Sequence, residues 1–98
     1  MTRLHIQSEA QDKVAAVIMT AISSEIKRME IGLEKTNRQI KKFEMEYNIS
    51  SDHFLQNYAA ENMKNADEGY IRWAGELKIR ERILEDLNHL KDIEYAAS

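Results

Sequence analysis

The chain has 98 residues, no proline and three glycines. Turns in sheets favour Gly and Pro, so this composition predicts a single all-α domain of a few long helices. The absence of cysteine excludes a disulfide scaffold and any thiolate metal site. The net charge of −3 is uneven: residues 27–42 carry +4 and residues 44–95 carry −6, and we expect these two segments to attract each other.

The longest apolar run, from Val14 to Ile22, is interrupted only by Thr20. Nine residues are too few for a bilayer, which needs about 20, and no basic segment with an apolar core opens the chain. We therefore expect no membrane-spanning helix and no signal peptide. We also expect the protein to be cytoplasmic.

The alternation of Leu4 and Ile6 suggests a short strand or an extended arm over residues 2–7. Ser8, with Gln11 three residues later, has the pattern of a helix N-cap. We expect a first helix over residues 8–47. A spacing of three and four residues marks one coiled-coil-like stripe on this helix, which faces a neighbouring helix. Its members are Ile26, Met29, Leu33, Thr36, Ile40, Phe43 and Tyr47.

Asn48 is suited to a left-handed C-cap, and Ser50 to the N-cap of a second helix over residues 51–64. Ile49 and Phe54 have the spacing of a hydrophobic staple, and Asp52 favours a helix N-terminus. The expected apolar face of this helix is Phe54, Leu55, Tyr58, Ala59 and Met63.

Asp67 is suited to capping a third helix, expected over residues 67–93. Its apolar positions cover more than half of its circumference, so we expect it to touch two neighbours. They are Tyr70, Trp73, Ala74, Leu77, Ile79, Ile83, Leu84, Leu87 and Leu90. The lengths fit a helical hairpin bridged by a short helix or an up-down-up bundle, and the short second helix favours the hairpin.

A third helix folded back along the stripe leaves about a dozen residues of the first helix uncovered. The apolar residues there predict a contact with a second chain, either another copy (a dimer) or a different protein. The alternative is that the third helix extends further along the first. The predicted interface consists of Val14, Val17, Ile18, Met19 and Ile22.

The basic residues of the first helix point away from the stripe and could follow phosphates. The alternative is a solvated face, because Glu30 and Glu34 interrupt it and no aromatic residues are interleaved. The candidate nucleic-acid contacts are Lys27, Arg28, Lys35, Arg38, Lys41 and Lys42.

No motif for catalysis stands out, and we expect neither an enzyme nor a cofactor. His89 follows Asp86 by three residues, a step found in di-iron bundles, but no second such step exists. Gly32, beside the stripe, suggests close approach of another helix, and Trp73 suggests a core anchor or an interface residue.

Two stretches resemble small helical prokaryotic proteins that serve as the antitoxins of two-gene toxin–antitoxin modules. One runs from Glu25 to Leu33 and continues with Phe43-Glu-Met-Glu-Tyr-Asn-Ile-Ser-Ser51 and Phe54; the other is Tyr70-Ile-Arg-Trp-Ala-Gly-Glu-Leu77. The resemblance covers roughly residues 24–92, and Asn48 stands where such relatives often have Gly. It implies a protein that neutralises a small toxin by covering its active surface, and it assigns no toxin-contacting residue.

Overall fold

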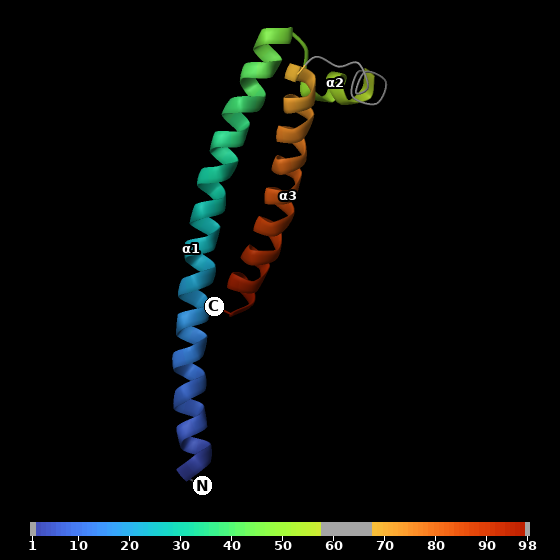
Figure 1. Ribbon diagram of the computed structural model, residues 1–98. Helices are drawn as coiled ribbons and strands as arrows, with labels where there is room; N and C mark the ends of the chain where they lie inside the picture. Colours follow the sequence, from blue (N-terminus) through green and yellow to red (C-terminus); the bar gives the residue numbers. More distant parts are fainter. Residues whose placement is uncertain (1, 58–67, 98) are drawn as a thin grey trace.

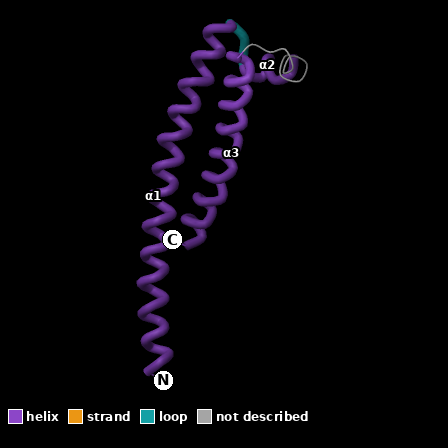
Figure 2. Tube along the Cα trace, viewed as in Figure 1, coloured by secondary structure: helices purple, strands orange, loops and turns teal. Residues whose placement is uncertain are grey.

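The computed structural model describes residues 2–57 and 68–97, with side chains from Ala10 onward. Helix α1 spans Thr2–Tyr47, α2 spans Ser51–Asn57 and α3 spans Glu68–Ala97. Helix α3 runs back beside α1, while the short α2 lies beside the start of α3 and projects away from the pair (Figures 1 and 2). The predicted all-α helical hairpin is therefore confirmed. Its long dimension of 69 Å equals the length expected of a 46-residue helix.

The predicted stripe on α1 is the surface that packs against α3. Ile26, Thr36 and Ile40 are buried, and the other four members are half-buried. Thr36, the one polar member, is only 6% exposed. On α3, Trp73, Ala74, Leu77 and Leu87 are buried. We call this α1 surface the inner seam, and the spacing of its residues was enough to locate it.

The turn between α1 and α2 follows the predicted caps. Asn48 has a φ of 57°, the left-handed conformation that ends a helix. The hydroxyl of Ser50 accepts a hydrogen bond from the backbone N–H of His53 at 3.1 Å, as an N-cap does. The backbone N–H of Ser51 donates to Glu44 Oε2 at 2.9 Å, which fastens α2 to the last turns of α1.

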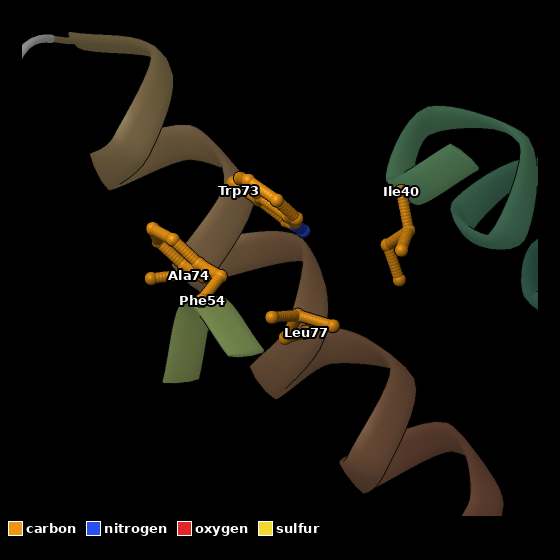
Figure 3. Packing of buried hydrophobic residues seen from close by; sticks show 5 residues of the cluster. All are labelled: Ile40, Phe54, Trp73, Ala74 and Leu77. Atoms are coloured by element: carbon orange, nitrogen blue, oxygen red, sulfur yellow. The ribbon is translucent and has the colours of Figure 1, made fainter. Parts of the chain in front are cut away.

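An aromatic cluster closes this end of the hairpin. Figure 3 shows Phe54 of α2 against Trp73 and Ala74 of α3, with Ile40 of α1 opposite. The rings of Phe54 and Trp73 stack at a centroid distance of 4.1 Å, and both side chains are fully buried. Trp73 Nε1 donates to Ser51 Oγ at 3.1 Å, so the buried indole has its hydrogen-bond partner. Of the two roles considered for Trp73, the structure places it as a core anchor.

Two expectations about the helix limits need correction. Residues 2–7 are helical, not a strand or an arm, so α1 starts before Ser8. A strand needs a second strand to pair its backbone groups, whereas a helix satisfies its own. Helix α3 continues past residue 93 to Ala97, where the chain consists of helix-compatible residues. The expected ends of the second helix at 64 and of the third at Asp67 lie outside the described residues.

Some predicted packing is also wrong. Leu55 is 47% exposed, because the short α2 reaches the core through Phe54. The other proposed members of that face, residues 58, 59 and 63, lie outside the described residues. Ile79 and Leu84 of α3 are 49% and 44% exposed, since α1 covers only one side of the helix there. Helix α3 therefore has two neighbouring helices, α1 and α2, only in the part that lies near α2. Along the rest of its length it packs against α1 alone among the described helices.

Two expectations about α1 are not met either. Among the described residues, an ion pair between the long helices links Glu30 of α1 to Lys91 of α3 at 3.4 Å, the opposite sense to the predicted attraction. The basic residues of α1 lie on its outer surface, away from α3. A Cβ on Gly32 would lie 4.0 Å from Ile83 Cδ1, an ordinary contact, so α3 does not need glycine there.

Candidate protein-docking surface on α1

Helix α1 extends well beyond the end of α3 (Figure 1). Near the end of α3, Ser23 Oγ of α1 donates a hydrogen bond of 2.8 Å to Glu94 Oε2 of α3. Every described side chain from Ala10 to Ile18 is exposed. We call residues 2–18 of α1 the overhang; at 1.5 Å per residue it is about 25 Å long. The overhang predicted from the helix lengths is therefore present, and it is longer than expected.

The predicted interface residues divide into two groups. Val14, Val17 and Ile18 lie in the overhang and are 55%, 69% and 50% exposed. Met19 and Ile22 are half-buried, because they continue the inner seam to the end of α3. The structure thus leaves three of the five residues uncovered within one chain, and the other two border them.

Two of the uncovered residues, Val14 and Val17, belong to a second line of three- and four-residue spacing, on the side of α1 opposite the inner seam. We call it the outer seam, and sequence reasoning missed it as one feature although its spacing is visible in the sequence. It consists of Ala10, Val14, Val17, Ala21, Ser24, Arg28, Ile31, Lys35, Arg38, Lys42 and Met45. All eleven side chains are exposed, including Ile31 at 68% and Met45 at 73%.

The outer seam changes character along its length. From Ala10 to Ala21 it is apolar, whereas from Arg28 to Lys42 it is mainly cationic. Shallow grooves flank the apolar part, one of them lined by Ala10, Gln11, Val14, Ala15 and Ile18. Alanine side chains end at Cβ, so another helix can approach this part of α1 closely. The geometry suits helix docking better than enclosure of a small ligand.

The six predicted nucleic-acid contacts are all exposed. Four of them, Arg28, Lys35, Arg38 and Lys42, fall on the outer seam. Arg28 Nη2 donates to Glu25 Oε1 at 2.6 Å, and this hydrogen bond, with the charge of Glu25, raises the pKa of Arg28. Its guanidinium therefore stays charged but is already paired. The basic residues form a line on one helix and do not converge on a pocket.

Within residues 10–57 and 68–97, no group of three His, Asp or Glu side chains is arranged to hold a metal ion. His89 and Glu85 are exposed on α3, and Asp86 beside them is half-buried. His53 lies on α2, where its Nδ1 is 3.3 Å from Asn57 Nδ2. The structure therefore does not bring these two histidines together.

None of the described helices combines the length and the apolar character that crossing a membrane requires. Comparison with protein-family models, with curated proteins and with solved structures gave no match to this chain.

Proposed function

We propose that this protein is a non-enzymatic protein-binding module that docks through the overhang of α1. The observation that carries the proposal is the exposure of Val14, Val17 and Ile18 on a helix that the rest of the chain leaves uncovered. Exposed apolar side chains that are grouped on one face of a protein commonly mark a surface that contacts another molecule. A second protein chain packed on the overhang would bury the exposed surface of these side chains, which is half or more of each.

The resemblance to antitoxins supports a more specific role, in which the module covers the active surface of a small toxin in the cytoplasm. The residues that carry the resemblance include Phe43, Tyr47, Phe54 and Trp73, which build the aromatic cluster at the closed end of the hairpin. They maintain the scaffold. The overhang lies outside the residues that carry the resemblance. Proteins that share the scaffold can therefore differ in the part of α1 that would bind a partner.

The test is co-expression with the product of the neighbouring reading frame. We expect that product to arrest growth alone and to be silenced by this chain. The double variant Val14→Glu with Val17→Glu should lose both the protection and co-purification of the two proteins. A matched control with Ile31→Glu and Met45→Glu changes outer-seam side chains of similar exposure, 68% and 73%, and should retain both. Equal behaviour of the two double variants would contradict docking through the overhang.

A second candidate function is nucleic-acid binding, favoured by the exposure of all six basic residues on α1. Phosphate contacts weaken steeply with salt, so binding to duplex DNA should fall by at least about tenfold between low and physiological salt. It should also fall on replacing Lys35 and Lys42 with Glu. Binding that ignores salt and both substitutions, or no binding at low salt, would remove this candidate.

A further inference from the structure

We infer that the apolar half of the outer seam pairs with the same segment of a second copy of this chain, in antiparallel orientation. The inference rests on the proposed function, because both place a protein chain on the overhang. It names a second copy of this chain as an occupant that would compete with a different partner for the same face, and it gives the direction of the helices and the register. The three arguments come from the order of residues along the seam, from the charges beside it and from the end of α3.

The apolar part of the seam reads the same in both directions. Its residues are Ala10, Val14, Val17 and Ala21, with steps of four, three and four. A two-fold contact requires that residue i meets residue j while j meets i. With the axis between residues 15 and 16, Val14 faces Val17 of the second copy, and Ala10 faces Ala21. Each layer then pairs side chains of equal size, with the larger pairs in the middle.

Charge disfavours the parallel alternative. Paired helices lie about 8–10 Å apart, so a parallel pair joined along the outer seam would set Arg28, Lys35 and Lys42 beside their own copies. That spacing is about one Debye length at physiological salt, so the repulsion is weakened there and is strongest at low salt. In the antiparallel pair the cationic stretches, centred near residue 35, are about 60 Å apart. Within residues 10–24 the only charged residues are Asp12 and Lys13, which lie off the seam, so no like charges face each other across that part of the contact. At each edge the same register sets Arg28 opposite position 3, also an arginine, so one like-charge pair remains there.

The hairpin itself leaves room for this pairing. Helix α3 packs on the inner seam, and the exposed side chains of Ala10, Val14, Val17 and Ala21 show that it does not cover the apolar half of the outer seam. The second copy would lie along the overhang while its own hairpin body extends past the first copy's N-terminus. Two such heptads bury little area compared with stable protein interfaces, so we expect a dimer that forms by mass action and not an obligate one.

Sedimentation equilibrium of the full chain, from about 10 to 500 µM, tests the pairing itself. We expect the mass to rise from 11.4 kDa toward twice that value. Val17→Glu, at a side chain 69% exposed, should weaken the dimer at least about tenfold. Met45→Glu, 73% exposed on the cationic half of the same seam, is the matched control and should leave it unchanged. A monomer throughout, or a dimer equally affected by both substitutions, would overturn the inference.

Disulfide trapping tests the direction. The chain has no cysteine, so an introduced one is unique. A mixture of the Val14→Cys and Val17→Cys chains should form the mixed disulfide ahead of either symmetric one, because only facing residues bring their Cα atoms within about 7 Å. Faster formation of the symmetric Val17→Cys disulfide would indicate a parallel pair and overturn the inference. A chain that stays monomeric but still binds the neighbouring gene product would refute the pairing and leave the proposed function intact. A chain that dimerises but binds no other protein would support the pairing and contradict the proposed binding of a different protein.

Discussion

The two ends of α1 belong to one continuous helix, yet they differ in almost every packing property. At the closed end, Ile40 is 2% exposed, and Phe43 and Tyr47 lie against the stacked rings of Trp73 and Phe54. At the open end, Val17 is 69% exposed and no element of the described chain covers it. Both ends carry apolar side chains at helical spacing, so the difference lies in what is available to cover them.

This contrast separates stability from binding. Burial of the aromatic cluster stabilises the hairpin, because each large side chain removed from water contributes about 1.5–3 kcal/mol. In a single chain the overhang buries no apolar surface of this kind. Its apolar side chains can therefore stabilise a complex, because they are removed from water only when another chain binds. Substitutions at the closed end should therefore change the free energy of unfolding, and those at the open end should change association.

The largest expected effect is that of Trp73→Ala, which leaves a cavity between Phe54, Tyr47 and Phe43. We expect a loss of about 3–5 kcal/mol in the free energy of unfolding. Trp73 is the only tryptophan, so urea unfolding should be followed by circular dichroism and not by fluorescence. Met45→Ala, at a side chain 73% exposed, is the control and should have little effect. A similar loss for both would mean that the aromatic cluster is not the centre of stability.

Ser51→Ala tests the polar contact inside the same cluster. It removes the acceptor of the Trp73 indole, and an unsatisfied buried donor costs about 1–3 kcal/mol. A double-mutant cycle with Trp73→Phe, which lacks the donor, isolates this pair. We expect Ser51→Ala to cost clearly less in the Trp73→Phe background. Equal costs in both backgrounds would assign the loss to the turn and not to the hydrogen bond.

Gly75→Ala should raise stability by about 1 kcal/mol, the difference in helix propensity between the two residues. A Cβ at position 75 meets nothing within 4 Å, so no clash offsets the gain. Gly32→Ala should gain a comparable amount, because the new Cβ would make an ordinary contact with Ile83. Thermal unfolding of both variants measures this. A lower melting temperature for Gly32→Ala alone would show that α3 approaches α1 more closely than the structure indicates.

The smallest expected effect on folding is that of Val17→Glu. Below the concentration at which copies associate, the free energy of unfolding should change by no more than about 0.5 kcal/mol, since the side chain has no tertiary contact to lose. Urea unfolding at the lowest usable protein concentration measures it. A loss comparable to that of Ser51→Ala would mean that the overhang is packed within its own chain, and the contrast between the two ends would fail.

Much of the closed end was predictable because its signals are local. The left-handed turn at Asn48, the cap at Ser50 and the inner seam from Ile26 to Tyr47 all follow from residue type and spacing. The helical start of α1 was missed, since Leu4 and Ile6 alone are too few to distinguish periods of two and 3.6. The outer seam was only partly recognised, because its basic and apolar halves were treated as separate features.

The sequence by itself determined that the chain forms helices, where the first helix turns into the second, and which stripe of α1 is buried. Those properties depend on backbone preference and on side chains a few positions apart. Only the tertiary structure decided that Leu55 and Ile79 stay exposed while Trp73 is enclosed by three helices. A pattern of apolar residues identifies a face that can be covered, whereas the relative lengths and positions of the helices decide which faces the chain covers itself.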